Sequence, residues 1–306
     1  MSLRLGSSKN PIESRENRPA RTMKKKIFFV FEGEETEKIY FEKIKNIIES
    51  SNNPQIPELY IFDRILKNRS NQLYVTKNIE EFLNNGQELK EKSEFDNLYV
   101  LLDKFKEDEE FSYDELVTQL KVIFKGRPNI VEALSKSSKF VEIVEQIDAL
   151  SNISTYKKDF DNVCIILDRD HHSFKEEQLK TVVEICKQNN FLLGLTNPCF
   201  EFYLLLHLSN SNGHDEQKLL KNKKINKNKT FVESILNDEY KKLKSNRAYK
   251  KSYYDADLFL SKLENLYENS SEFPIDMTNL DSKLGSLIPD MLNKLEIKDI
   301  IIEYYK

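Results

Sequence analysis

The sequence predicts an α/β fold in which a mostly parallel sheet is flanked by helices. Two apolar runs, at 26–31 (KIFFVF) and 163–167 (VCIIL), have the composition of strands buried on both faces of a parallel sheet. Each run is followed by a segment with apolar residues at helical spacing, at 36–47 and 177–188. Buried strands that alternate with amphipathic helices are typical of α/β proteins.

Length and composition exclude several classes of protein. The 306 residues allow one large domain or two ordinary ones, and 39% of them are hydrophobic. No apolar run has the length of a membrane-spanning helix, so we expect no membrane association. Cys164, Cys186 and Cys199 lack metal-ligand spacing and fit reduced core residues of a cytoplasmic protein. The net charge of −4 means that binding of nucleic acid would depend on local basic patches.

The first strand runs directly into an acidic turn, EGEETE at 32–37. Gly33 permits a tight turn from strand to helix, which places Glu32 at the carboxyl edge of the sheet. A carboxylate at the end of a buried strand is costly without a cation or a proton, so Glu32 is a candidate site residue. Glu35 and Glu37 are interpreted as complementing the positive end of the following helix.

A near-copy of one segment predicts a further strand. Residues 95–105 (FDNLYVLLDKF) resemble 160–170 (FDNVCIILDRD), which places a strand at 98–102 beside the one at 163–167. Asp103 occupies the position of Asp168 and is a candidate metal ligand, with a strand-end cap as the alternative.

The remaining elements complete the expected organisation. Strands are expected at 59–65 and 191–195 and a helix at 74–89, and the C-terminal part reads as amphipathic helices over 256–266 and 284–301. The predicted organisation is a flexible basic tail (1–23), an α/β domain (24–210) with a helical insertion (106–159), and a basic, helical C-terminal region (211–306).

Two carboxylates follow the strand at 163–167, where ligands of open α/β sheets bind. Asp168 and Asp170 leave the strand at i and i+2, so their oxygens can converge on a hard cation such as Mg²⁺ or Mn²⁺. His171 is a further candidate. The alternative is a solvated acidic turn before a helix.

A second informative segment is NPCFEFYLLLH, at 197–207. Proline is favoured at the first helical position, so a helix is expected to open at 197–198. Glu201 lies on an apolar helix face and is expected to point toward Glu32 and Asp168, with a structural salt bridge as the alternative. His207 lies near aromatic residues and fits a satisfied core histidine better than a ligand.

Residues 215–251 form a basic stretch, with 12 Lys and Arg against 5 Asp and Glu, interrupted by Tyr240 and Tyr249. A basic stretch beside a carboxylate site suits an enzyme acting on nucleic acid, because cations hold phosphates. The candidate phosphate contacts are Lys223, Lys224, Arg247 and Lys250. A solvated lysine-rich loop is the alternative.

Three blocks together, EGEETEKIYF (32–41), LDRDHH (167–172) and NPCFEFYLLLH (197–207), resemble the RloB/AbiLii family of phage-defence proteins. That resemblance implies a toprim-like (Rossmann-like) catalytic domain. By motif position it implies that Asp168 and Asp170 bind Mg²⁺ and that Glu32 acts as general acid/base or ligand. It also implies a role for Glu201 and an ATPase partner protein. Over 120 residues separate Glu32 from Asp168, more than a minimal toprim core has, so the order of the strands stays open.

The expected function is therefore metal-dependent cleavage of phosphodiester bonds in DNA or RNA, in anti-phage defence or abortive infection. The chain has no Walker A pattern and no G-x-S-x-G motif, which argues against P-loop ATP hydrolysis and serine esterase chemistry. Two alternatives stay open. One is a nucleotide-sugar transferase whose DxD holds a metal, and the other is a non-catalytic regulatory subunit of an ATPase-linked complex.

Overall fold

The computed structural model describes most of the chain outside the N-terminal tail and the segment 126–155. The described ranges are 24–33, 35–51, 56–62, 72–88, 112–123, 156–171, 173–211, 213–227, 229–244, 247–273 and 280–306, with a few single positions between them. Within these ranges no helix combines the length and the apolar character needed to span a bilayer.

The described strands form one mixed sheet with the order β2-β1-β3-β4-β5. β1 (Lys26–Phe31), β2 (Glu58–Phe62), β3 (Asn162–Asp168) and β4 (Leu192–Asn197) are parallel, whereas β5 (Gly285–Ser286) pairs antiparallel with the end of β4. β1 and β3 are central neighbours, in the register Phe31 opposite Ile166. The predicted mostly parallel sheet flanked by helices is confirmed, and the strand order that the sequence left open is decided.

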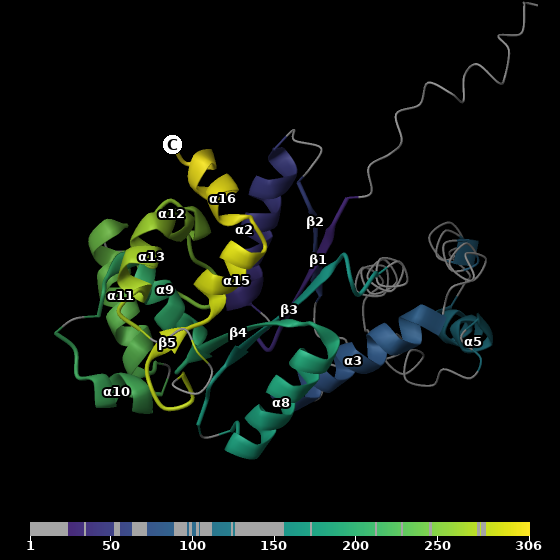
Figure 1. The fold of residues 1–306 in the computed structure, drawn as a ribbon, viewed down its shortest axis with the longest axis horizontal. Helices are drawn as coiled ribbons and strands as arrows, with labels where there is room; N and C mark the ends of the chain where they lie inside the picture. The colour runs from purple at the N-terminus through teal and green to yellow at the C-terminus, as the bar shows by residue number, and fades with distance from the viewer. Residues whose placement is uncertain are drawn as a thin grey trace, which may run out of the picture.

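Helices cover both faces of the sheet, so the fold has three layers (Figure 1). One face packs against α3 (Gln72–Glu88), α5 (Tyr113–Ile123) and α8 (Glu176–Asn189). The other face packs against a larger group of helices: α2 (Thr36–Ser50), α9 (Phe200–Leu208), α10 (Glu216–Lys221), α11 (Phe231–Leu243), α12 (Ala256–Leu260), α13 (Leu263–Ser270), α15 (Ile288–Lys294) and α16 (Lys298–Tyr304).

Alternation along the central strands builds a core on each face. Ile27, Phe29 and Phe31 of β1 belong to the core under α2 and α9, while Phe28 and Val30 belong to the core under α3 and α8. Successive side chains of a strand point to opposite faces, so an uninterrupted apolar run suits a strand covered on both sides. This is why these runs could be recognised from the sequence.

The strand predicted at 98–102 is wrong, since the described residues 97, 100, 101 and 104 are helical. Val100 is 65% exposed, whereas Leu101 is buried in the core with α3 and α5. In β3, by contrast, every residue from 163 to 167 is buried. A short apolar run fits a buried strand or one face of a helix equally well, and the similarity between the two segments did not resolve this ambiguity.

The C-terminal elements are more broken than predicted. The stretch 256–266 contains the whole of α12 and the start of α13, and the stretch 284–301 contains β5, α15 and part of α16. Glu296, with φ 60°, lies in the turn between α15 and α16. A left-handed residue ends a helix, which explains why one long helix does not form.

Candidate active site at the carboxyl edge of the sheet

Glu32 and Asp168 lie at the same edge of the sheet, because they end neighbouring parallel strands. The backbone N–H of Glu32 donates a hydrogen bond to the carbonyl oxygen of Ile166 at 3.3 Å, which extends the β1–β3 pairing by one residue. Asp168 is the last residue of β3. Both side chains line a cavity of about 370 Å³. The expectation that these two carboxylates meet agrees with this geometry.

The N-terminus of α9 is tied directly to this edge. The N–H of Phe200, the first residue of α9, donates to Oδ1 of Asp168 at 2.7 Å. The first N–H groups of a helix lack partners within the helix, and a carboxylate satisfies them well. The next residue, Glu201, is thereby brought to the same place as Asp168, and it is 3% exposed. Glu201 points into the carboxylate cluster rather than to solvent.

The start of α9 differs from the prediction. Asn197 is still part of β4, where it pairs with Gly285, and the Asn197–Pro198 peptide bond is cis. The side-chain Nδ2 of Asn197 also donates to the carbonyl oxygen of Leu280 at 2.9 Å. These contacts with the C-terminal region hold Asn197 in the sheet, so the helix begins at Phe200, two residues after the proline.

A third glutamate, Glu37, belongs to the cluster and was missed by the sequence analysis. Glu37 lies in the first turn of α2, as expected, but it is buried with 6% exposure. Its carboxylate packs on Gly33, where an added Cβ would lie 2.1 Å from Oε2 of Glu37. Gly33 therefore serves to admit this carboxylate. The spacing in the sequence was an indication of this contact, because Gly33 precedes Glu37 by about one helical turn.

Lys251, from the C-terminal region, supplies a cation to the cluster. Its Nζ lies 2.7 Å from Oε1 of Glu201 and 3.1 Å from Oε1 of Glu233. The side chains of the two glutamates are almost fully buried, whereas that of Lys251 is 51% exposed. Burial acts to lower the pKa of the Lys251 ammonium, but the two carboxylates outweigh it and raise this pKa above its usual value. The ion pair expected as the alternative role of Glu201 is thus present, and it lies inside the site.

Asp168 is the electrostatic centre of this arrangement. Burial raises the pKa of its carboxyl group well above the usual value, and the carboxylates of Glu37, Glu32 and Glu201 raise it further. Lys251 acts in the opposite direction. Four carboxyl groups gathered at one cavity repel one another, which favours the uptake of a proton or of a cation. A strongly perturbed group in a cavity is a typical feature of a functional site.

Two adjoining cavities meet at Asp168, Glu201 and Lys251, and their charges are opposite. The smaller one, of about 370 Å³, is acidic and is also lined by Glu32 and Glu37. The larger one, of about 560 Å³, is lined in addition by Lys221, Lys223, Lys224 and Asp170. An acidic cavity beside a basic one matches the needs of a cation and a phosphate ester, respectively.

The DxD motif divides between the two cavities. Asp170 lines only the larger of these two cavities, and its Oδ2 accepts a hydrogen bond from Ser173 Oγ at 2.8 Å. Arg169 between them is buried and pairs with Asp281 at 2.7 Å, so it has a structural role. His171 lines the larger cavity. Its pKa is lowered by burial and by the nearby Arg169, which keeps the imidazole neutral at neutral pH.

His207 is a core residue and lies outside both cavities. It is fully buried, with Nε2 at 2.9 Å from the hydroxyl of Tyr40 and Nδ1 at 3.1 Å from the carbonyl oxygen of Tyr203. Burial lowers its pKa to about 3. Both ring nitrogens therefore have partners, and the interpretation as a satisfied core histidine agrees with these contacts.

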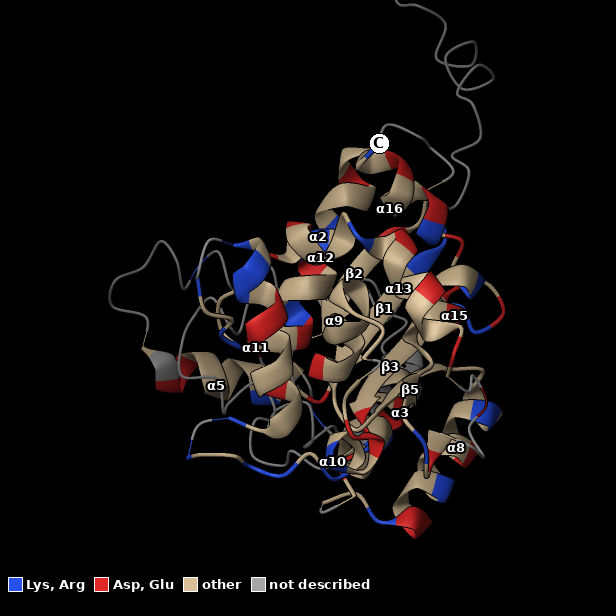
Figure 2. Cartoon of the chain, turned by 90° about the vertical axis from the view of Figure 1, so that its left-hand side faces the viewer, with Lys and Arg blue, Asp and Glu red and all other residues tan. Residues whose placement is uncertain are grey.

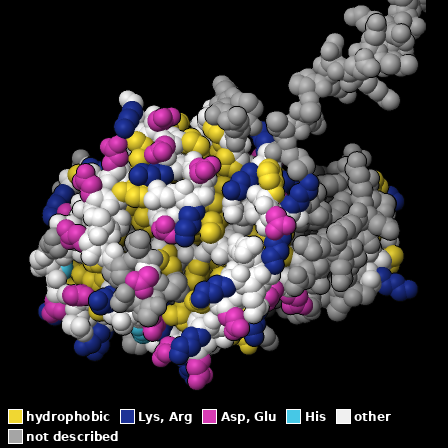
Figure 3. All heavy atoms as spheres, in the orientation of Figure 1, with side chains coloured by type: hydrophobic (Ala, Val, Ile, Leu, Met, Phe, Trp, Pro, Cys, Tyr) yellow, Lys and Arg dark blue, Asp and Glu magenta, His cyan; other side chains and the backbone are white. Residues whose placement is uncertain are grey.

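The basic candidates do not all reach the site. Lys223 and Lys224 line the larger cavity, in a hairpin-like segment between α10 and α11 in which Lys224 pairs with Thr230 (Figure 2). Arg247 and Lys250 are exposed and line neither cavity. Figure 3 shows acidic and basic side chains interspersed over the face drawn there, so that face presents no single basic patch.

The two tyrosines that interrupt the basic stretch have a structural role. Tyr240 and Tyr249 are buried, with their ring centroids 6.1 Å apart. The hydroxyl of Tyr240 also accepts a hydrogen bond from the N–H of Asp255 at 3.0 Å. The position of these two tyrosines among lysines in the sequence therefore did not indicate that their rings lie at the surface.

The remaining candidate metal ligand, Asp103, lies outside the described residues. Among the residues that the structure describes, no three His, Cys, Asp or Glu side chains stand close enough together to hold a metal ion as they are. The donor set nevertheless fits a hard divalent cation, since carboxylate oxygens are the ligands that Mg²⁺ and Mn²⁺ prefer. Oε2 of Glu32 is moreover shielded from solvent.

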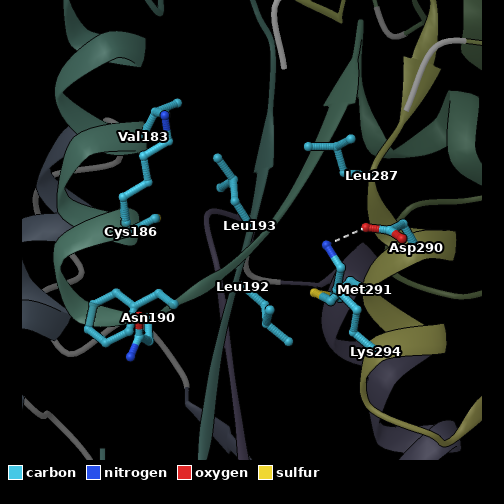
Figure 4. A pocket seen from close by; sticks show the side chains of 11 residues that line it. Val183, Cys186, Asn190, Leu192, Leu193, Leu287, Asp290, Met291 and Lys294 are labelled. Atoms are coloured by element: carbon cyan, nitrogen blue, oxygen red, sulfur yellow. Dashed lines mark ion pairs between the residues drawn. The ribbon is translucent and has the colours of Figure 1, made fainter. Parts of the chain in front are cut away.

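A third cavity, of about 540 Å³, lies away from this edge, between α8, the first half of β4 and α15 (Figure 4). Its lining is mainly apolar, and its acidic residue, Asp290, pairs with Lys294 at 2.7 Å. It lacks converging carboxylates among the described lining residues. We therefore assign the candidate chemistry to the carboxyl edge.

The part of the chain that carries Asp168, Glu201 and Lys251 matches a known protein family. A family model described as RloB-like protein matches residues 105–294, a range that contains the DxD motif, the NPCFE segment and Lys251. The search of curated proteins and the search of solved structures gave no match. Since the family model covers more than half of the 306 residues, the chain belongs to the RloB-like family, which is associated with phage defence.

Proposed function

We propose that this protein is a toprim-type, metal-dependent nuclease that hydrolyses phosphodiester bonds of DNA or RNA in defence against phage. The observation that carries the proposal is the acidic cavity at the carboxyl edge of the sheet, where Glu32, Glu37, Asp168 and Glu201 gather, beside a cavity lined by lysines. Family membership supports the defence role and the association with an ATPase partner.

The proposed metal ligands are Asp168 and Glu32, together with Asp170, which lines the larger cavity. A bound Mg²⁺ or Mn²⁺ supplies charge neutralisation at the scissile phosphate and a more acidic water molecule. Because Oδ1 of Asp168 accepts the N–H of Phe200, its carboxylate is held in a fixed orientation. Glu32, at the end of β1, is the proposed acceptor of the proton from the attacking water.

The lysines have two separate roles in this proposal. Lys223 and Lys224 hold phosphate groups of the substrate in the larger cavity. Neither lysine takes part in an ion pair among the described contacts. Lys251 pairs with Glu201 and Glu233, so its positive charge offsets part of the negative charge that a phosphate of the substrate would meet. Removal of a phosphate contact weakens binding of all sequences about equally.

The test is a cleavage assay on plasmid, single-stranded DNA and tRNA, with Mg²⁺ or Mn²⁺ and with EDTA, together with calorimetric titration of Mn²⁺. Asp168→Ala is expected to lose both metal binding and cleavage. Glu32→Gln should retain part of the metal affinity and lose turnover. Asp170→Ala tests whether the second aspartate of the motif is a ligand.

Asp290→Ala is the matched control, because it removes an acidic residue from the third cavity. It should cleave like the wild type. Cleavage by Asp168→Ala at the wild-type rate would refute the proposed function, as would activity that is unchanged in EDTA.

A further inference from the structure

A short turn next to the candidate site presents an aromatic ring to solvent. Lys250 and Tyr253 form an isolated antiparallel bridge, and the N–H of Tyr253 donates to the carbonyl oxygen of Lys250 at 3.0 Å. The side chain of Tyr253 is 77% exposed, whereas Tyr249 and Tyr254 on either side of the turn are buried. Isolated exposed rings are common in proteins, so the position of this ring carries the argument.

The turn is held rigidly against the site. The hydroxyl of Tyr254 donates to the carbonyl oxygen of Thr36 at 2.6 Å, and the hydroxyl of Thr36 donates to the carbonyl oxygen of Lys251 at 3.4 Å. The side chain of Lys251 is in turn paired with Glu201 at 2.7 Å. Tyr253 is two residues from Lys251, hence within about 7.6 Å along the backbone. The backbone that carries the ring is therefore held beside Lys251, which lines both cavities.

The larger cavity adds cations to this rim. Lys221, Lys223 and Lys224 line it together with Lys251. The segment that carries them is braced, since the N–H of Phe231 donates to the carbonyl oxygen of Lys223 at 3.0 Å. A group of cations and an exposed ring, carried on hydrogen-bonded backbone segments near Lys251, are the two components of a surface that binds single-stranded nucleic acid.

We infer that Tyr253 is a stacking platform for an unpaired base of the substrate, whose phosphates lie along Lys221, Lys223 and Lys224. This inference rests on the proposed nuclease function and names its substrate class as single-stranded DNA or RNA, including unpaired loops and ends. The physical reason is that an unpaired base offers a free face to the ring, whereas the bases of a duplex are stacked on one another. The lysine contacts are common to both forms of substrate.

The test measures binding without cleavage. Fluorescence anisotropy with labelled single strands of DNA and RNA and with a duplex is recorded in EDTA for the wild type and the variants. Tyr253→Ala should weaken binding of single strands by about 5- to 150-fold, as expected for the loss of one stacked base, and should change duplex binding little. Tyr253→Phe keeps the ring and should bind like the wild type. Tyr304→Ala, which removes another exposed tyrosine, on α16, is the control.

The substrate gives a second, independent arm. A single strand with abasic positions should bind the wild type as weakly as an intact strand binds Tyr253→Ala, and the two losses should not add. Additive losses would overturn the inference, because the ring and the bases would then act separately. Equal loss of single-strand and duplex affinity in Tyr253→Ala would overturn it as well.

Unchanged single-strand affinity in Tyr253→Ala would refute the stacking role. So would a wild type that binds no single strand. The outcome for the proposed function is read separately, from cleavage with Mg²⁺ or Mn²⁺. A protein that cleaves with an unimportant Tyr253 refutes the inference alone, whereas tight, Tyr253-dependent binding without metal-dependent cleavage refutes the nuclease alone.

Discussion

Replacement of Lys251 by methionine tests the electrostatic account of the site most directly. The change keeps a long, flexible side chain and removes the charge that pairs with Glu201 and Glu233 at 2.7 and 3.1 Å. With an effective dielectric constant of about 20, the two attractions amount to roughly 6 and 5 kcal/mol before desolvation is counted. Desolvation of the charges opposes most of this attraction.

The net effect lies between two measured limits. Breaking a buried pair costs about 3–5 kcal/mol, because a buried charge is left alone, and exposed pairs contribute about 0–1 kcal/mol. The side chain of Lys251 is 51% exposed, while those of Glu201 and Glu233 are 4% and 8% exposed. Water can therefore reach the position of the lost ammonium. We expect a decrease of about 2 kcal/mol in the free energy of unfolding.

The assay is urea denaturation at neutral pH in EDTA, compared with Lys250→Met. Lys250 is the neighbouring exposed lysine and is a matched control for the loss of one positive charge. Mn²⁺ should restore more stability to Lys251→Met than it adds to the wild type, because a bound cation replaces the missing charge beside Asp168. Equal unfolding free energies for Lys251→Met and Lys250→Met would refute the electrostatic reasoning.

Three further predictions follow from the same contacts. Gly33→Ala should displace the carboxylate of Glu37 and reduce Mn²⁺ affinity by about tenfold or more, as changes beside metal ligands do. Its melting temperature should stay close to that of the wild type. Calorimetry measures the affinity, and unchanged binding would exclude Glu37 from the site. Mn²⁺ at a hundredfold excess over its dissociation constant should stabilise the wild type by about 2.7 kcal/mol and Asp168→Ala not at all, as thermal melts will show. The pKa of His207 is about 3, below its usual value, so the unfolded chain binds the proton more tightly and the free energy of unfolding should fall as the pH drops from about 6.5 toward 3. Between pH 7.5 and 5 this decrease amounts to about 2 kcal/mol. His207→Phe should lack this decrease when urea titrations at the two pH values are compared.

The central layer of the fold could be predicted from the sequence because its information is local. An apolar run such as 163–167 has few stable environments other than a strand covered on both faces. The carboxyl ends of parallel strands meet at one edge of the sheet. The proximity of Glu32 and Asp168 could therefore be predicted before their strands were known to be neighbours.

Local information was insufficient where two structures suit the same run of residues. The segment 98–102 copies a strand in its composition and is helical where it is described, since its exposed Val100 faces away from the core that buries Leu101. The helix expected at Pro198 begins later, because Asn197 is held by residues from the C-terminal region. In the second case the deciding contacts come from a distant part of the chain.

An α/β protein with carboxylates at the ends of its buried strands could be inferred from the residues alone. Which other groups join these carboxylates depends on how the helices pack on the sheet. Lys251 meets the site through contacts such as that with Thr36, 215 positions away, and no local pattern distinguishes it from the other lysines around it. Likewise, Tyr240 and Tyr249 are buried and Tyr253 is exposed, although all three lie between residues 240 and 253 of the chain. Spacing along the chain determines periodicity, whereas the partner of a side chain depends on which surfaces meet when the helices pack on the sheet.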